Sequence, residues 1–366
     1  MKQPWVHSAG LDSTFILAPA FLVTAVVLTL GDSVRAIAEM PPLLWLLLIV
    51  GVDVGHVWST LFRTYLDRGE LRARQALYVL TPLLGFVLGV VLYRLGDMLF
   101  WRTLAYLAAF HFVRQQYGFM MIYRRAEQAD PAWARRLDQV LIYAATLYPL
   151  IAWHCQPRQF DWFVPGDFLA FDTPIVAVVT GWAYLAMFAA YVAKEVVFAL
   201  RRGGFNLPKN LMLLGTALSW YVGILVFDND LAFTATNVIA HGVPYMALIW
   251  IYGRNQQAHD QRRTDYLLPV ARLFQPKVVP IYLGALFIIA YLEEGLWDGL
   301  VWRENSMLFP AFAHLPELEN PAILTWLVPL LALPQITHYL LDAYIWRLGV
   351  ANTPWKTILF LNSTKT

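Results

Sequence analysis

Apolar residues in this sequence come in repeated runs of about 20, separated by short segments rich in Arg, Lys or turn residues. A helix of that length crosses the hydrocarbon core of a bilayer. Charged residues make up only 14% of the chain, against about 25% in soluble domains. The sequence therefore predicts an all-α, polytopic integral membrane helix bundle; it excludes a disordered chain and argues against a water-soluble globule.

The apolar runs predict about ten transmembrane helices, with both ends of the chain on one side, in a single transmembrane domain, 1–366. The predicted spans are 14–30, 42–65, 76–93, 99–122, 137–154, 174–199, 210–227, 231–252, 278–293 and 321–346.

The distribution of positive charge predicts the orientation of these spans. Of the 27 Lys and Arg residues, 21 fall in the connections of one side and five in those of the other. Because positive charge is retained on the cytoplasmic side, both termini are expected in the cytoplasm. The first apolar run lacks a small-residue cleavage site and is expected to be a retained span. The expected localisation is a cell inner membrane of bacterial type, crossed several times.

Composition excludes several kinds of site. The one cysteine, Cys155, can form neither an internal disulfide nor a thiolate-rich metal site. A net charge of +2 does not indicate a nucleic-acid partner, and the sequence has no glycine-rich phosphate loop.

Ionisable side chains inside the predicted spans concentrate in four even-numbered ones. Such side chains are costly in hydrocarbon unless they are paired, so each one requires a partner. Each of these spans carries one histidine with polar neighbours: Asp53 and His56 in the second, His111, Arg114 and Gln115 in the fourth, Asn237 and His241 in the eighth, and His338 and Asp342 in the tenth.

Spacing and depth indicate that the four histidines belong together. Three of them have a polar neighbour three or four residues away, which lies on the same helix face. All four are 7 to 13 residues from the first cytoplasmic arginine of their helix, about 10 to 20 Å below the membrane boundary. We therefore predict one shared metal site. A structural polar network or a path for protons or ions is the alternative.

The predicted metal ligands are the four histidines, His56, His111, His241 and His338, with Asp53 and Asp342 as further ligands or as residues that orient the imidazoles. Imidazole and carboxylate donors suit iron or zinc. Six ligands are enough for two irons, whereas three histidines and one aspartate would make a zinc site. Iron is the favoured cofactor, zinc is the alternative, and haem held by histidine pairs is a further one.

This site predicts a membrane metalloenzyme of lipid metabolism, a non-haem iron or di-iron oxidase, hydroxylase or desaturase acting on a lipid or other apolar substrate. An intramembrane zinc hydrolase of lipid amides or esters and a proton-coupled transporter are the alternatives. An iron enzyme of this kind would take electrons from an external donor, since the sequence shows no flavin, haem or iron–sulfur domain.

Other polar residues receive supporting roles. Asn237 and Gln115 are expected to support the histidines by hydrogen bonds. The guanidinium of Arg114 is always charged, so we expect it either to pair with an aspartate of the site or to hold a substrate carboxylate or phosphate. Glu293 and Glu294 are expected to be solvated helix ends.

Two prolines lie close to predicted ligands. Pro244 follows His241 by three residues, and Pro334 precedes His338 by four. Proline inside a helix removes a backbone hydrogen bond and usually kinks the axis, so kinks beside both histidines would open space for a pocket. Packing alone is the alternative reason for these prolines.

Overall fold

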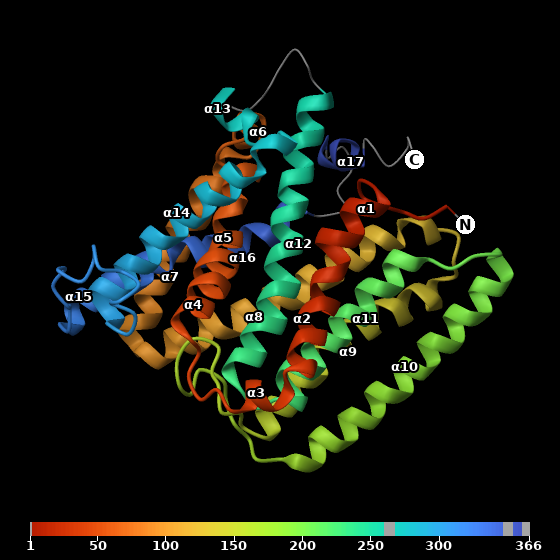
Figure 1. Ribbon diagram of the computed structural model, residues 1–366, viewed down its shortest axis with the longest axis horizontal. Helices are drawn as coiled ribbons and strands as arrows, with labels where there is room; N and C mark the ends of the chain where they lie inside the picture. The colour runs from red at the N-terminus through yellow and green to blue at the C-terminus, as the bar shows by residue number, and fades with distance from the viewer. Residues whose placement is uncertain (1, 260–267, 347–353, 361–366) are drawn as a thin grey trace. The chain divides into compact units, whose positions relative to one another are not determined.

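The computed structural model describes residues 2–259, 268–346 and 354–360 (Figure 1). All regular structure in these ranges is helical, and no strand occurs in them. The chain forms two compact units, each assembled from separated segments. In the described part of the chain, the first unit comprises 2–39 and 109–244, and the second comprises 40–108 and the residues from 245 onward.

Two long helices, α8 (Asp97–Arg124) and α12 (Asp230–His259), pass without a break from one unit into the other. The remaining helices of the first unit are α1 (Ala9–Asp12), η1 (Ser13–Leu17), α2 (Ala18–Thr29), α3 (Gly31–Arg35), η4 (Arg125–Glu127), α9 (Ala132–Cys155), α10 (Pro174–Arg202), α11 (Leu207–Tyr221) and η5 (Val222–Val226). Within this unit α9 packs against α10 and α11, and α11 packs against α2 (Figure 1).

Local signals explain where α10 ends and α11 begins. Gly203 follows α10 with a φ of 64°, a left-handed conformation that glycine adopts without steric cost and that commonly ends helices. The side chain of Asn206 then accepts a hydrogen bond from the backbone N–H of Lys209 and caps α11.

A buried network of charged side chains connects the helices α8, α9, α10 and α11 within the first unit. Lys209 on α11 is fully buried, and its ammonium lies 2.8 Å from Glu127 Oε2 and 2.5 Å from Glu195 Oε1. The other ion pairs of the network join Lys209 to Asp138, Arg124 to Asp138 and Asp130, Lys194 to Asp138 and Glu195, and Arg202 to Glu127 and Asp130. Four positive and four negative side chains therefore compensate one another, which is the condition for burying them.

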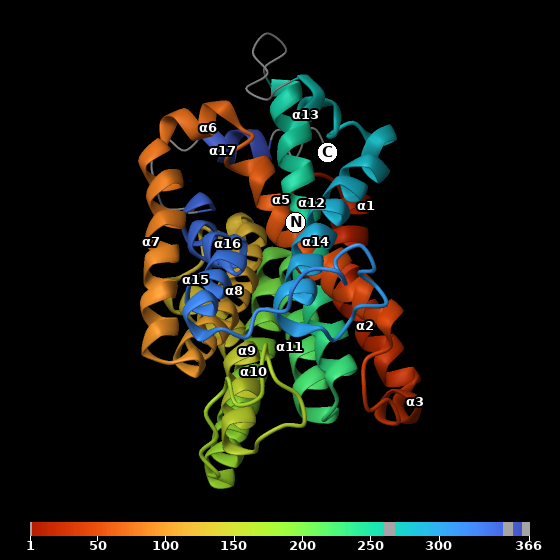
Figure 2. The same ribbon diagram turned by 90° about the vertical axis from the view of Figure 1, so that its left-hand side faces the viewer.

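The second unit contains α4 (Pro42–Trp45), η2 (Leu46–Val54), α5 (Gly55–Ser59), η3 (Thr60–Arg63), α6 (Arg68–Ala73), α7 (Gln75–Leu95), α13 (Leu268–Arg272), η6 (Pro276–Val278), α14 (Val279–Trp297), η7 (Asp298–Trp302), α15 (Pro321–Leu331), α16 (Leu333–Ile345) and α17 (Pro354–Leu359). Here α14 packs against η2 and α5, and α15 and α16 pack along α7 (Figure 2). Close approach of α16 requires Gly85 on α7, since a Cβ there would lie 2.8 Å from a methyl carbon of Ile336.

Seven of the described helical segments are long and apolar enough to cross a membrane, or eight if the bent pair α15 and α16 is one span. They are 9–29, 42–63, 75–95, 174–202, 207–226, 230–258 and 276–302, with 321–331 and 333–345 as the bent pair. The predictions of an all-helical chain and of a multi-pass membrane protein are confirmed at this level. The two remaining predicted spans correspond to α8 and α9, long helices whose more polar sequences keep them outside this set.

The two prolines near the predicted ligands have different effects. Pro334 is the second residue of α16, directly after a break at which α15 and α16 are bent by 41°. Pro244 lies inside α12, which continues through it as one helix. The predicted kink therefore accompanies a helix break beside His338, whereas no break interrupts α12 beside His241.

Candidate metal centre

The first pair of histidines, His111 on α8 and His241 on α12, lies within the first unit. Both side chains are buried, and their Nε2 atoms are 3.2 Å apart. The ring planes cross at 83°. At this distance the N–H of one neutral imidazole can donate a hydrogen bond to the nitrogen of the other, or both nitrogens can direct a lone pair toward a cation.

Neighbouring residues of α8 hold His241 in place. The ring of Phe112 stacks on the His241 imidazole, with centroids 3.6 Å apart and planes within 6°. The side-chain amide of Gln115 donates a hydrogen bond of 2.8 Å to the backbone carbonyl of His241. Because Phe112 directly follows His111, one turn of α8 supplies a candidate ligand and the contacts that orient its partner.

Asn237 lies one turn before His241 on α12 and is also buried. Its amide nitrogen donates to the carbonyl of Phe233 at 3.0 Å, which leaves its Oδ1 without a donor among the described residues. The Oε1 of Gln115 is in the same situation. These two buried acceptors have the chemistry to hold a water molecule.

The second pair, His56 on α5 and His338 on α16, lies within the second unit. Both side chains are buried, and their ring centroids are 4.9 Å apart with planes at 80°. The hydroxyl of Thr60 contacts His338 Nδ1 at 2.6 Å and the hydroxyl of Tyr245 at 3.1 Å. A partner at Nδ1 fixes the orientation of the ring, so the ligand atom of His338 would be Nε2.

The predicted acidic ligands occupy a more peripheral position in this unit. Asp53, in the π-helical segment η2, has its Oδ1 3.7 Å from His56 Nδ1. Asp342 interacts with the hydroxyl of Tyr245. Neither carboxylate is among the side chains that could hold an ion together, which in the described residues are the four histidines. Asp53 therefore matches the orienting role better than the ligand role, whereas Asp342 acts on Tyr245.

Arg114 has a partner that the sequence did not indicate. Its side chain is exposed on α8, its Nη1 donates to the hydroxyl of Tyr143 at 2.6 Å, and its guanidinium lies 5.0 Å from the ring centre of Tyr117. The contacts of Arg114 among the described residues are therefore with two tyrosines instead of the predicted aspartate.

Glu293 differs from the solvated helix end expected from the sequence. It lies inside the candidate span 276–302 and is buried, and its Oε2 accepts a hydrogen bond from Trp58 Nε1 at 2.5 Å. The Glu293–Glu294 sequence occurs before the end of α14, which continues for three more residues, so sequence reasoning placed the boundary of the helix too early.

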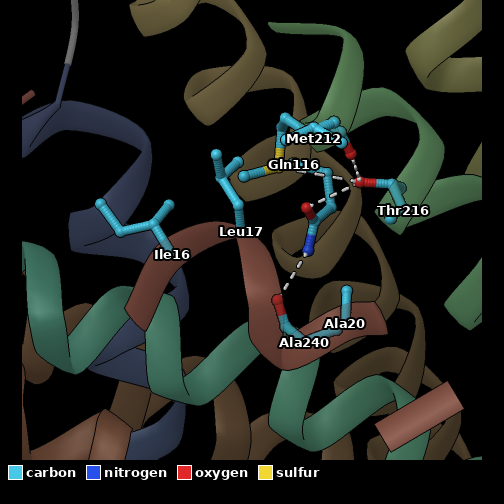
Figure 3. Close-up of a pocket in the computed structure, with 9 residues that line it drawn as sticks. Ile16, Leu17, Ala20, Gln116, Met212, Thr216 and Ala240 are labelled. Carbon is cyan, nitrogen blue, oxygen red and sulfur yellow. Dashed lines mark hydrogen bonds between the residues drawn. The ribbon is translucent and has the colours of Figure 1, made fainter. Parts of the chain in front are cut away.

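A small cleft lies in the first unit, and Ala240 is one of the residues that line it (Figure 3). Gln116 spans it, accepting a hydrogen bond from the Thr216 hydroxyl at 3.0 Å and donating to the carbonyl of Ala240, the residue before His241. The other lining residues are Ile16, Leu17, Ala20, Leu211, Met212 and Gly215. The cleft is apolar apart from Gln116 and Thr216.

Comparisons with family models, with curated proteins and with solved structures find no match for this chain. Four buried histidines, each offering one ring nitrogen, could bind a metal ion.

Proposed function

We propose that this protein is an integral membrane metalloenzyme in which His56, His111, His241 and His338 together hold one metal ion. The observation that supports the proposal best is that four buried imidazoles occur as two facing pairs. A buried polar ring costs free energy unless its nitrogens are satisfied. One cation would satisfy all four rings.

The two pairs are linked through a single continuous helix. On α12, His241 of the first pair is followed one turn later by Tyr245. Tyr245 packs edge-on against both rings of the second pair, His56 and His338, with centroids 5.9 and 5.2 Å away. The four histidines also lie at similar distances along the sequence from the first cytoplasmic arginine of their helices, which supports a single shared site.

The donor set favours iron. Four protein ligands would complete the tetrahedral shell of zinc, as in structural zinc sites, whereas catalytic zinc keeps one position open. Non-haem iron keeps positions open beside its protein ligands. Because Asp53 and Asp342 are not in the ligand group, one iron fits this donor set better than two.

With iron bound, the centre would supply oxygen activation for an oxidase, hydroxylase or desaturase reaction on a lipid or other apolar substrate, with electrons from an external donor. The residues of this chain have their own tasks. Thr60 orients His338, Phe112 and Gln115 hold His241, and the buried oxygens of Gln115 and Asn237 can retain a water molecule. The apolar helices around the histidines exclude bulk solvent.

We further propose ten membrane-crossing helices, with α8 and α9 included, both termini in the cytoplasm and a location in a bacterial-type inner membrane. The support is the 21 to five distribution of Lys and Arg between the two sides. A polar helix such as α8 can cross a membrane when its polar face is covered by other helices.

Metal analysis of the detergent-purified protein tests the proposed function. We expect about one iron per chain, and loss of most of that iron in His241→Ala and in His56→Ala, one variant from each pair. His314→Ala, in which an exposed histidine is removed, should keep the metal and is the matched control.

Other outcomes would redirect or reject the proposal. One zinc per chain would favour the hydrolase, and a Soret band would indicate haem. A metal-free protein would reject the metalloenzyme and favour the proton-coupled transporter. Full metal content in either His56→Ala or His241→Ala would show that the two pairs do not share one ion.

A further inference from the structure

Arg63 is a buried cation at one end of the helical segment that carries His56. The distribution of Lys and Arg predicts that this end is cytoplasmic. It is the last residue of the candidate span 42–63 and of η3, and its side chain is fully buried. The guanidinium carbon lies 4.5 Å from the ring centre of Tyr252 and 5.5 Å from that of Trp346.

Two of the three guanidinium nitrogens of Arg63 lack an acceptor among the described residues. Its ionic contact is with Glu70, whose Oε2 is 3.1 Å from Nη1, and Glu70 is shared with Arg74, whose Nη1 is 3.1 Å from Oε1. Among the described residues, no hydrogen-bond acceptor serves Nε or Nη2 of Arg63, and the acceptor that faces Nη1 is Glu70. A buried guanidinium has five N–H donors, and leaving them unsatisfied is costly.

The aromatic rings do not supply what is missing. Tyr252 and Trp346 stabilise the positive charge through their ring faces. The N–H groups of a guanidinium, however, lie in its own plane and require oxygen atoms at its edge. A carboxylate or phosphate matches this planar fork and accepts two hydrogen bonds at once.

The surrounding charge also favours an anion. The segment 63–74 contains four arginines and two acidic residues, a net charge of +2. Burial raises the pKa of one of these acids, Asp67, although the charge of Arg63 acts in the opposite direction. Glu70, the other acid, is divided between two arginines.

We propose that Arg63 binds the oxyanion head group, a carboxylate or a phosphate, of an amphiphilic substrate. This inference rests on the proposed function and specifies its substrate class. Arg63 follows His56 by seven residues on consecutive helical segments, a separation of about 10 to 12 Å. A head group at Arg63 therefore directs the apolar chain of the substrate along this helix toward the histidine layer.

Ligand binding to the purified protein in neutral detergent tests the inference. Oleate is compared with oleyl alcohol, and phosphatidic acid with a neutral diacylglycerol, so that each pair differs in the oxyanion. Wild-type protein should bind the anionic member roughly tenfold or more tightly, the usual effect of a hydrogen bond to a charged group. Inorganic phosphate is added as a competitor to distinguish a lipid head group from a free anion.

Variants of opposite expected effect separate binding from misfolding. Arg63→Gln should abolish the preference for the anionic ligand. Glu70→Gln should strengthen it, because both arginines lose their carboxylate, and a gain of affinity cannot result from misfolding. Arg94→Gln, which removes an exposed arginine in the last turn of α7, should leave the preference unchanged.

The inference is overturned if wild-type protein binds oleate and oleyl alcohol equally, or if Arg63→Gln keeps the preference. Displacement of phosphatidic acid and oleate by millimolar inorganic phosphate alone would overturn the amphiphile and leave a free anion as the ligand. The same measurements on metal-free protein separate the two proposals. If no metal binds but the oxyanion preference depends on Arg63, the metalloenzyme fails and the head-group site stands.

Discussion

The hydroxyl of Thr60 contacts both His338 and Tyr245, and Thr60 is not itself a candidate ligand. Groups that hydrogen-bond the non-ligating nitrogen of a histidine fix its tautomer and orientation. Thr60→Val keeps the size of the side chain and removes this contact. We expect metal affinity to fall by about 10 to 100 fold, measured by competition with a chelator of known affinity.

The control for Thr60→Val is Thr325→Val, since the hydroxyl of Thr325 is exposed and bonds only its own helix at Pro321. Thr325→Val should retain wild-type affinity. Equal affinity in the wild type and Thr60→Val would show that His338 is not a ligand through Nε2, or that its orientation is fixed by packing.

At the same residue scale, the sequence identified the histidines but not their contacts. Spacing within one helix places Asn237 near His241 and Asp53 near His56, because those offsets are local. The stack of Phe112 on His241 and the contact of Thr60 with His338 join residues more than 100 positions apart. The contacts of Arg114 with Tyr143 and Tyr117 were not predicted for the same reason, since the residues that cover its face of α8 depend on how neighbouring helices pack.

At the scale of elements, the buried ion network of the first unit links η4, α10 and α11 through Lys209. Lys209→Met would leave Glu127 and Glu195 with one partner fewer in a buried environment. Breaking a buried ion pair in this way costs about 3 to 5 kcal/mol. We expect a marked decrease in the thermal denaturation midpoint in detergent, without selective loss of metal from the protein that remains folded.

Two comparisons make the Lys209 prediction specific. Arg201→Met removes an exposed cation at the end of α10 and should change the midpoint little. Adding Glu195→Gln to Lys209→Met removes one of the uncompensated charges and should recover part of the loss. An unchanged midpoint in Lys209→Met would contradict the role of the network.

A second element-scale prediction concerns the contact between α12 and the segment after α13. A Cβ at Gly253 would lie 2.3 Å from a ring carbon of Phe274, a buried residue. Gly253→Ala therefore forces this aromatic ring to move, and overpacking of this kind costs about 1 to 3 kcal/mol. Gly284→Ala on α14, where a Cβ meets nothing within 4 Å, should be neutral or stabilising in the same denaturation experiment.

The existence of the helices could be predicted from the sequence, whereas their breaks could not. All ten predicted spans correspond to helices, because a long apolar run has no other way to satisfy its backbone in a bilayer. The π-helical segment η2 before His56 and the 41° bend before α16 carry no comparable signal. Pro334 lies at the bend, but Pro244, which is also within four residues of a candidate ligand, lies in a helix without a break.

At the scale of the whole molecule, the number of crossing helices determines on which side the connection 125–131 lies. If α8 and α9 both cross, as we propose, this connection is cytoplasmic, and if neither crosses it is outside. The other predicted loops keep the same side in both cases, because two crossings are gained or lost together. The connection between α8 and α9 is therefore the position at which the ten-span and eight-span topologies differ.

Single-cysteine labelling resolves this difference, since Cys155 can be replaced by serine to give a cysteine-free background. Gln128→Cys, Gln156→Cys and Arg201→Cys each place a thiol at an exposed position. With a membrane-impermeant maleimide on intact cells, Gln156→Cys should react, whereas Gln128→Cys and Arg201→Cys should react only after permeabilisation. Reaction of Gln128→Cys in intact cells would place α8 outside the set of crossing helices, and His111 would then not share a membrane depth with the other three histidines.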